Sequence, residues 1–305
     1  MNNIYGIEAG GTKFICAWGT GPDDLHDRIV IPTTTPAETM SQVIAHIQAV
    51  QRKARLHGIG AAVFGPLGLN PELKHYGYIT STPKLAWRYY DFIGTLQNAV
   101  SLPVVFDTDV NVTAQGEYYW GAGQGISDFI YMTVGTGIGA GAIVNGKLCH
   151  GAMHPEMGHI LIPKLPHDCG KSVCAYHDAC LEGLASGPSL QARWSVSDAM
   201  DLPLDHPAWE MEAHYLTMAL TNYTLCYSPK RIIMGGGVMQ QTQLFQMIRE
   251  KLMSFLGGYV KHQYLENLME YVMPPMLKNN AGVLGAIALA QTEFGMVENN
   301  VALPA

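Results

Sequence analysis

The sequence predicts an α/β fold in two domains. Apolar β-prone runs alternate with segments of helical spacing along most of the chain, which is the pattern of α/β proteins. The chain has 305 residues, roughly twice the length of a common domain. In addition, a strand, a glycine-rich turn and a second strand occur together twice, near residues 4–18 and near 129–144.

The first half of the chain is predicted to begin with a hairpin joined by Gly10-Gly11-Thr12-Lys13. Pro36 suits the first turn of a helix, and apolar residues follow it at helical spacing. The elements expected here are strands at 4–9, 14–18, 28–32, 59–64 and 103–106, a helix from Pro36, a long irregular stretch over 65–90 and a helix over 109–120.

The second half repeats the opening pattern. Asn145-Gly146 is a hairpin signal, because both residues tolerate the positive φ that tight two-residue turns require. The elements expected here are strands at 129–134, 140–144 and 231–234, helices over about 206–227 and 241–256, and a final helix over about 282–292.

Composition and charge exclude several classes of function. Hydrophobic residues make up 48% and charged residues 14% of the chain, so it is expected to fold. The net charge is −7 and basic residues do not cluster, which argues against nucleic acid as a partner. The chain has neither a signal-peptide pattern nor an apolar run long enough to cross a membrane. We therefore expect a cytoplasmic protein whose six cysteines are reduced and which has no membrane partner.

Three glycine clusters are candidate binding loops. Glycine-rich turns leave backbone N–H groups open to anions, and Gly10 to Lys13 and Thr133 to Gly139 are two such turns. The alternative is that both are simply tight turns that need positive φ. Gly235 to Gly237 end a strand, where a flat ring can lie against backbone; the alternative is a plain loop. The Walker A motif and the dinucleotide fingerprint are both absent.

Carboxylates follow one of the predicted strands. Asp107 and Asp109 come between the strand at 103–106 and a helix. One interpretation is a base that accepts a hydroxyl proton during phosphoryl transfer. The alternative is that Asp107 or Asp109 caps the helix.

A cysteine and histidine cluster predicts a metal site. Cys174-x-x-His177-x-x-Cys180 has the spacing and donor types of a structural zinc site, which needs a fourth ligand. The candidates for the fourth ligand are His154, His159, His167 and Cys169, and the alternative is surface histidines beside buried cysteines.

Two carboxylates adjoin this cluster. If His159 and Cys180 bind one metal, Glu156 and Glu182 are expected to lie close together, as acceptors for a polyhydroxylated ligand. The alternative is that both are solvated carboxylates at helix ends.

These motifs together resemble the ROK family (repressor, open reading frame, kinase) of bacterial sugar kinases, and within it most closely the zinc-containing fructokinases. The likeness covers nearly the whole chain and rests on these segments: Glu8 to Lys13, Phe64 to Pro66, Tyr76 to Lys84, Asp109 to Asn111, Thr136 to Gly139, His154 to His159, Cys180 to Gly183 and Gly235 to Gly237.

The resemblance implies a two-domain actin-like ATPase fold, related to ribonuclease H, with ATP and sugar bound in an interdomain cleft. The expected domains are residues 1–115 with the C-terminal helix 282–305, and residues 116–281 with a zinc-binding insertion at 149–182.

The resemblance also implies roles for single residues. Asp109 matches the catalytic base. The sugar-site positions are Asn111, Glu156, His159 and Glu182. The ATP-site positions are Gly10, Gly11, Thr12, Lys13, Thr136, Gly137, Pro188, Gly235, Gly236, Gly237, Val238 and Met239. The zinc ligands are His159, Cys174, His177 and Cys180, which leaves Cys169 outside the site.

The chain departs from the family pattern at three places. Many members have Asp where this chain has Glu8, which bears on the binding of Mg²⁺. Many have Asn where this chain has Thr108, a change that removes an amide contact to the sugar and favours a ketose. The commonest zinc motif is replaced by Cys-x-x-His-x-x-Cys, as in the fructokinase branch.

The resemblance therefore implies an ATP-dependent and Mg²⁺-dependent kinase that phosphorylates fructose at its 6-hydroxyl. The alternatives are a hexokinase that prefers mannose or glucose, and a sugar-sensing regulator or sugar-binding protein without catalysis. Family members are often homodimers, so a homodimer is expected.

Overall fold

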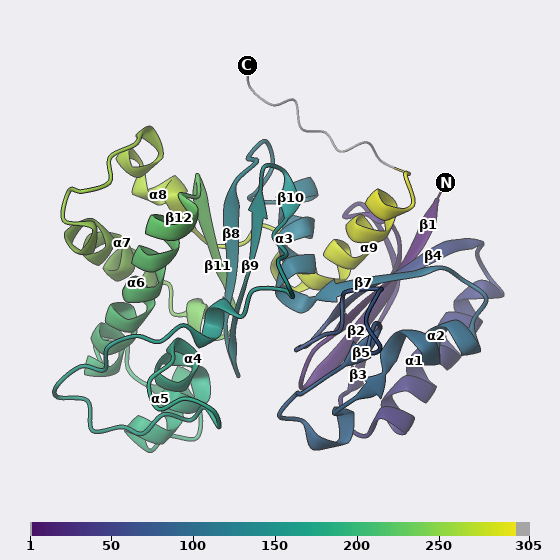
Figure 1. Ribbon diagram of the computed structural model, residues 1–305, viewed down its shortest axis with the longest axis horizontal. Coiled ribbons are helices and arrows are strands. Elements are labelled where there is room, and N and C mark those ends of the chain that lie inside the picture. Colours follow the sequence, from purple (N-terminus) through teal and green to yellow (C-terminus); the bar gives the residue numbers. More distant parts are fainter. Residues whose placement is uncertain (1, 297–305) are drawn as a thin grey trace. The chain divides into compact units, whose positions relative to one another are not determined.

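The computed structural model describes residues 2–296 (Figure 1). Residues 297–305 of the predicted segment 282–305 lie outside the described residues. The chain divides into two compact units: Met1–Gly125 with Leu148–Pro155 and Met276–Ala305, and Ile126–Lys147 with Glu156–Pro275. Residues 116–125, 148–155 and 276–281 thus belong with the first unit by their contacts, although the sequence-based boundaries assign them to the second domain.

The first unit is built on a five-stranded sheet with the strand order β3-β2-β1-β4-β7. Its strands are β1 (Asn3–Ala9), β2 (Lys13–Gly21), β3 (Asp24–Pro32), β4 (Leu56–Val63) and β7 (Val104–Thr108). Its helices are α1 (Pro36–Gln51), α2 (Phe92–Ala99), α3 (Asp109–Trp120) and α9 (Ala281–Glu293), and a small hairpin pairs β5 (Tyr78–Ile79) with β6 (Tyr90–Asp91).

Both faces of this sheet are buried. Tyr5 and Ile7 of β1 pack into a core with residues of α1 and α2, whereas Ile4 of the same strand packs against Ile287 of α9. The labels of α1, α2 and α9 locate these helices beside the sheet in Figure 1. Neighbouring side chains of a strand point to opposite faces, so a strand covered on both sides becomes apolar throughout. This explains why β1 and β4 appear in the sequence as continuous apolar runs.

The second unit repeats the same arrangement of strands in a second five-stranded sheet, β10-β9-β8-β11-β12. In each sheet one central strand pairs antiparallel with the strand that follows it and parallel with a later one, as β1 does with β2 and β4, and β8 with β9 and β11. The strands are β8 (Phe129–Val134), β9 (Ile138–Val144), β10 (Lys147–Leu148), β11 (Arg231–Gly235) and β12 (Val272–Met273). The predicted repeat of a strand–turn–strand unit is therefore confirmed.

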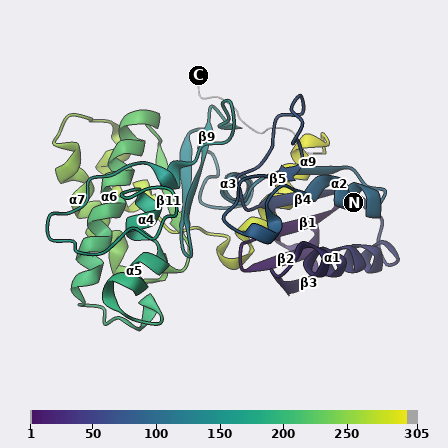
Figure 2. The same cartoon turned by 60° about the horizontal axis from the view of Figure 1, so that its bottom comes forward.

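Helices α6 (Pro207–Tyr227) and α7 (Gln243–Leu256) pack side by side in the second unit (Figure 2). The shorter helices are α4 (Leu181–Ala185), α5 (Gly187–Trp194) and α8 (Leu268–Tyr271). The predicted helices at 109–120, 206–227, 241–256 and 282–292 are confirmed, with ends that differ by at most two residues. Helices α2, α4, α5 and α8 were not predicted. Among the described residues, no helix is both long and apolar enough to cross a membrane.

Helices α3 and α9 approach closely because each carries a glycine at the contact. A Cβ on Gly116 would lie 2.9 Å from the Cα of Gly285, and a Cβ on Gly285 would lie 2.0 Å from the carbonyl oxygen of Val112. This contact fixes α3 against α9, and the N-terminus of α3 carries Asp109 and Asn111.

We expect Gly285→Ala to lower the free energy of unfolding by about 1–3 kcal/mol, because the new methyl group forces the two helices apart. Urea denaturation measures this change. Gly151→Ala is the matched control, since its nearest neighbour would be 3.9 Å away. Equal stability of the two variants would contradict the close α3–α9 contact.

Candidate functional site

The turn between β1 and β2 presents unpaired N–H groups. The N–H of Gly10 donates to the carbonyl oxygen of Lys13 at 3.0 Å and closes the turn. Gly11 and Thr12 donate no hydrogen bond within the described part of the chain. A Cβ on Gly10 would lie 2.8 Å from the Lys13 oxygen, so this glycine is needed for space.

The equivalent turn in the second unit lies between β8 and β9. Gly135 donates to the Gly137 carbonyl at 2.9 Å, and the N–H of Ile138 donates to the Glu182 carboxylate at 3.0 Å. Thr136 and Gly137, in contrast, donate no hydrogen bond among residues 2–296. Both turns thus leave two adjacent N–H groups available for an anion.

Three predicted ATP-site segments converge in the second unit. The N–H of Gly187, which precedes Pro188 in the first turn of α5, donates to the Gly135 carbonyl at 2.7 Å. A Cβ on Gly135 would lie 3.9 Å from the backbone nitrogen of Gly237, and a Cβ on Gly237 would meet nothing within 4 Å. The backbone at Gly135 and Gly237 therefore borders open space. The side chains of Val238 and Met239 are buried.

The alternative that the glycines serve only positive-φ turns is wrong at most of these positions. Of the glycines in the three clusters, Gly236 alone lies in the left-handed region, with φ of 95°. Its Cβ would also lie 2.3 Å from the Val134 carbonyl oxygen. At Gly10 a Cβ would collide with the backbone oxygen of Lys13, and at Gly137 it would displace the Glu182 carboxylate.

The alternative that Asp107 or Asp109 caps the helix is also wrong. The N-cap of α3 is Thr108, whose hydroxyl accepts a hydrogen bond from the Asn111 N–H at 3.3 Å. Asp109 is the first residue of the helix, and its carboxylate accepts the N–H of Val110 at 2.9 Å as well as its own backbone N–H. Burial raises the pKa of Asp109 to about 6, which is suitable for a base near neutral pH.

A second carboxyl group lies in the same unit. Glu8, at the end of β1, is half-buried and accepts a hydrogen bond from the N–H of Val283 at the start of α9. Burial, together with the charge of Asp109, raises the pKa of Glu8 to about 7. A Cβ on Gly282 would lie 2.4 Å from the Glu8 carboxyl carbon, and the Glu8 Oε2 is buried with no hydrogen-bond partner among residues 2–296.

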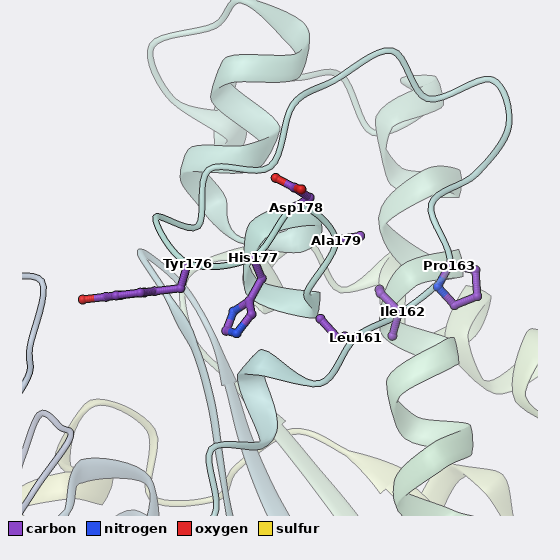
Figure 3. Close-up of a pocket in the computed structure, with 7 residues that line it drawn as sticks. All are labelled: Leu161, Ile162, Pro163, Tyr176, His177, Asp178 and Ala179. Atoms are coloured by element: carbon purple, nitrogen blue, oxygen red, sulfur yellow. The ribbon is translucent and has the colours of Figure 1, made fainter.

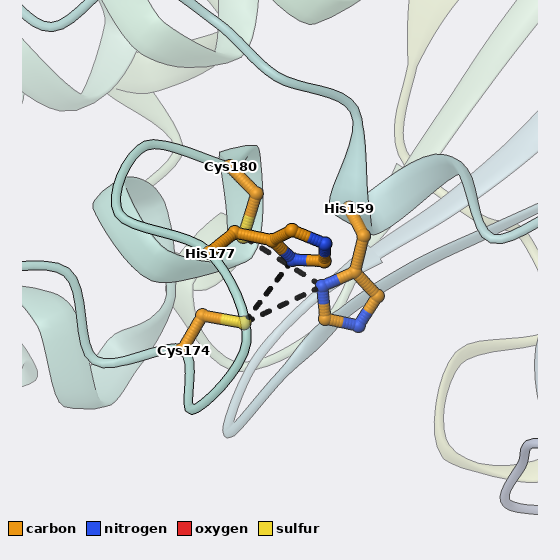
Figure 4. Close-up of side chains that lie close together, drawn as sticks. All are labelled: His159, Cys174, His177 and Cys180. Carbon is orange, nitrogen blue, oxygen red and sulfur yellow. Dashed lines mark hydrogen bonds between the residues drawn. The ribbon is translucent and has the colours of Figure 1, made fainter.

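The four predicted metal ligands form one cluster (Figure 4). The donor atoms of His159, Cys174, His177 and Cys180 all lie within 4.8 Å of one another. Both histidines direct Nδ1 at a sulfur: His159 to Cys174 at 3.8 Å and to Cys180 at 3.6 Å, and His177 to Cys174 at 3.5 Å. Among the described residues, His154, His167 and Cys169 lie outside this cluster.

The three sulfur–nitrogen distances fit tetrahedral coordination of one metal ion. With metal–sulfur and metal–nitrogen bonds of about 2.3 and 2.05 Å, the edge of the tetrahedron between sulfur and nitrogen is about 3.6 Å. The thiols of Cys174 and Cys180 also accept N–H groups, from Tyr176 at 3.4 Å and from Gly183 at 3.3 Å, which suits thiolates. Without a metal, burial raises the pKa of Cys180 to about 11.

The loop that carries the cluster is anchored to α5 and α6. Asp168 accepts the Arg193 Nε–H at 3.0 Å and the Tyr215 hydroxyl at 2.6 Å. These hydrogen bonds hold the pKa of Asp168 below its usual value against the effect of burial. The Ser172 hydroxyl donates to the His177 carbonyl at 2.6 Å and so shapes the loop next to the ligands.

Glu182 connects the metal cluster to the turn between β8 and β9. Its Oε2 accepts the Ile138 N–H, and its Oε1 lies 3.8 Å from Nε2 of His159. The alternative that Glu182 is simply a solvated helix-end carboxylate is therefore wrong. Glu156 is exposed and precedes the short helix Met157–His159. The predicted proximity of Glu156 and Glu182 stays a prediction.

An open depression lies beside the cluster (Figure 3). Its lining is mainly apolar and consists of Leu161, Ile162, Pro163, Tyr176, His177, Asp178 and Ala179. His177 is the one predicted site residue among them. The lining therefore lacks the convergent donors and carboxylates that a sugar phosphate or nucleotide needs.

Sequence reasoning missed two features of the first unit. The Lys84 side chain lies over the first glycine turn, where a Cβ on Gly11 would be 2.9 Å from the Lys84 Cε. The available signal was that Lys84 ends the segment Tyr76 to Lys84, which contributes to the family resemblance although the sequence assigned Lys84 no role. The second feature is an ion pair between Asp107 and His150, with Nε2 and Oδ2 2.7 Å apart.

Comparison with known proteins points to one family. The model of the ROK family matches residues 4–293. A fructokinase of Pediococcus pentosaceus is 45% identical over 285 residues, covering 93% of this chain and 96% of that protein.

Solved structures show the same fold. A ROK hexokinase from Thermus thermophilus has a TM-score of 0.77 at 23% identity and covers 97% of this chain and 100% of that chain. A ROK glucokinase from Streptomyces griseus, solved with glucose and AMPPNP, has a TM-score of 0.76 at 23% identity, covering 95% of this chain and 100% of that chain. The predicted two-domain actin-like ATPase fold is confirmed.

Proposed function

Because the chain belongs to the ROK family, we propose that it is an ATP-dependent fructokinase that transfers the γ-phosphate of ATP to the 6-hydroxyl of D-fructose. The observation that supports this proposal most is the position and the raised pKa of Asp109. Its carboxylate does not cap a helix, has a pKa of about 6 and sits at the end of β7, on the helix fixed by α9. Such a group can accept the hydroxyl proton as the sugar oxygen attacks phosphorus.

The ATP phosphates would be bound by the two glycine turns. The free N–H groups of Gly11, Thr12, Thr136 and Gly137 are suitable donors to phosphate oxygens, and Lys13 and Lys84 add positive charge. On the adenosine side we place Pro188 and the backbone of Gly235 to Met239, because the backbone at Gly135 and Gly237 borders open space and Gly187 is hydrogen-bonded to Gly135. Lys84 extends the set of ATP-site residues that the sequence predicts.

Two metal ions are part of the proposal. The buried and unpartnered Oε2 of Glu8 is a hard oxygen donor of the kind that Mg²⁺ prefers. When bound with ATP, Mg²⁺ neutralises charge on the phosphates. The His159, Cys174, His177 and Cys180 donors fit Zn²⁺, which would have a structural role by holding His159 and Glu182 in place for the sugar.

Fructose is proposed over other hexoses for two reasons. The relative with 45% identity is a fructokinase, whereas the structure solved with glucose shares 23% identity. In addition, Thr108 stands where many family members have Asn, and its hydroxyl is used to cap α3. The sugar site thus lacks one amide, with Asn111, Glu156, His159 and Glu182 as its proposed residues.

A substrate panel tests the proposal. We expect kcat/KM for fructose to exceed that for mannose and glucose by at least about tenfold, since a hydrogen-bonding site rejects sugars that leave its polar groups unpaired. ADP release gives the rates, and phosphorus NMR distinguishes fructose 6-phosphate from fructose 1-phosphate. A higher kcat/KM for glucose or mannose would contradict the assignment of fructose as the preferred substrate. Absence of ADP release with every sugar would contradict the proposed kinase activity.

We also propose that the protein acts in the cytoplasm, where ATP is available and thiolates stay reduced, and that it forms a homodimer. Sedimentation of the purified protein measures the second point. A monomer at micromolar concentration would contradict the dimer without affecting the proposed reaction.

A further inference from the structure

Asp107 is the centre of a hydrogen-bond network at the end of β7. It is buried, and its Oδ1 accepts both the N–H of Thr108 at 2.6 Å and the side-chain Nδ2 of Asn111 at 2.9 Å. Its Oδ2 accepts from Nε2 of His150 at 2.7 Å. All of these residues belong to the first unit.

The Asp107 carboxylate decides which way the Asn111 amide faces. A carboxylate accepts hydrogen bonds, so the NH₂ end of the amide must point at Asp107. The carbonyl oxygen of Asn111 is then at the opposite end and can accept a bond from a sugar hydroxyl. Without the Asp107 carboxylate the Asn111 amide can turn over by 180°, and its NH₂ donor would then face the sugar in place of its carbonyl oxygen.

His150 completes the network with a hydrogen bond that favours its charged form. Its hydrogen bond to Asp107 raises the pKa of the imidazole, and its ring also bonds to the backbone at Leu148. The titratable groups that face it are Asp107 and His154. His154 stays neutral, because burial lowers its pKa and its Nε2 accepts the N–H of Leu67 at 3.0 Å. Asp107 therefore pairs with the one charged histidine of the segment Leu148–Pro155.

We propose that Asp107 and His150 are positioning residues for the hexose: they orient the Asn111 amide and hold the segment Leu148–Pro155 against the end of β7. This inference rests on the proposed function. Neither residue transfers a proton to the substrate, so their loss changes the affinity for sugar and leaves the phosphoryl-transfer step and the affinity for ATP largely intact.

The test compares His150→Ala and Asp107→Asn with the conservative variant His150→Gln. We expect His150→Ala and Asp107→Asn to raise the fructose KM by roughly ten- to a hundredfold, because each variant loses one charge-assisted hydrogen bond. The kcat and the KM for ATP should change by less than about threefold. Gln retains an N–H donor for Asp107, so the fructose KM should return to within about threefold of the wild-type value.

The pH profile provides a readout that a merely structural role would not change. The wild-type fructose KM should rise at alkaline pH as His150 loses its charge, and this rise should be absent from His150→Gln. The matched control is His26→Gln, which makes the same change in an exposed histidine–aspartate pair of the same unit, with Asp24 at 2.6 Å, and should leave every constant unchanged.

The outcomes are distinguishable. A wild-type protein that phosphorylates no hexose would overturn the proposed function and this inference together. An active wild-type protein with an unchanged hexose KM in His150→Ala, or with kcat and both KM values changed alike, would overturn this inference alone. If the preferred sugar is another hexose, the same constants are measured with that sugar.

Discussion

Replacement of Asp109 by Asn should lower kcat by about 10²- to 10⁴-fold, the usual contribution of a general base. Asn has the same shape as Asp, and its amide oxygen can accept the same backbone N–H groups, among them that of Val110, so the fold of α3 should be retained. Coupled measurement of ADP release gives kcat, and thermal unfolding checks that the variant is folded. Near-normal turnover in this variant would remove Asp109 from the role of base.

The pH dependence of kcat/KM in the wild-type protein is a second test of Asp109 as the general base. A base must be ionised, and burial gives Asp109 a pKa of about 6 in the free protein. Below that pH, kcat/KM should fall by about tenfold per unit. Glu8 titrates nearby with a pKa of about 7, so the measured profile reports both groups.

Two control variants separate these contributions. Glu8→Gln removes the second titration and should leave one inflection, from Asp109. Asp23→Asn alters an exposed carboxylate in the β2–β3 turn and should change neither the rate nor the profile.

The second large effect concerns the metal. We expect the purified protein to hold about one zinc ion per chain and the double variant Cys174→Ser/Cys180→Ser to hold none. Zinc sites with thiolate and imidazole ligands contribute on the order of 10 kcal/mol to the folding of small domains. In this larger chain we expect a loss of at least about 3 kcal/mol, which corresponds to a decrease in Tm of roughly 6–12 °C.

The zinc experiment has an internal control. Cys169 is exposed and lies outside the cluster of four donors, so Cys169→Ser should retain both metal and Tm. Elemental analysis gives the metal content, and scanning calorimetry gives the Tm. A metal-free wild-type protein with full activity and an unchanged Tm would rule out a zinc requirement.

Sequence patterns predicted the elements whose signals are local. The two glycine turns, the β-prone runs beside them and the 21-residue helix α6 all have their determinants within one segment. Helix α2 was missed because it has eight residues, too few for a clear period, and its N-cap Asp91 lies within an aromatic-rich stretch.

The candidate functional site was likewise predictable from the sequence only where its residues lie close together along the chain. Cys174, His177 and Cys180 are close in sequence, and their spacing alone indicated a metal site. Asp107 and His150 are separated by 43 residues, and Gly11 and Lys84 lie still further apart in sequence, so no local pattern connects either pair. The role of Thr108 as N-cap also needed the backbone geometry, because Asp, Thr and Asn all favour that position.

The position of α9 has a consequence for the synthesis of this protein. The helix is the last described in the chain, yet it covers β1 and β4, where Ile287 packs on Ile4 and Ala286 packs on Ala62. The ribosome makes this sheet before α9, so one apolar face of the sheet stays uncovered until α9 has been made. The nascent chain must be protected from aggregation in that interval, and truncation before Met276 would leave the face permanently open.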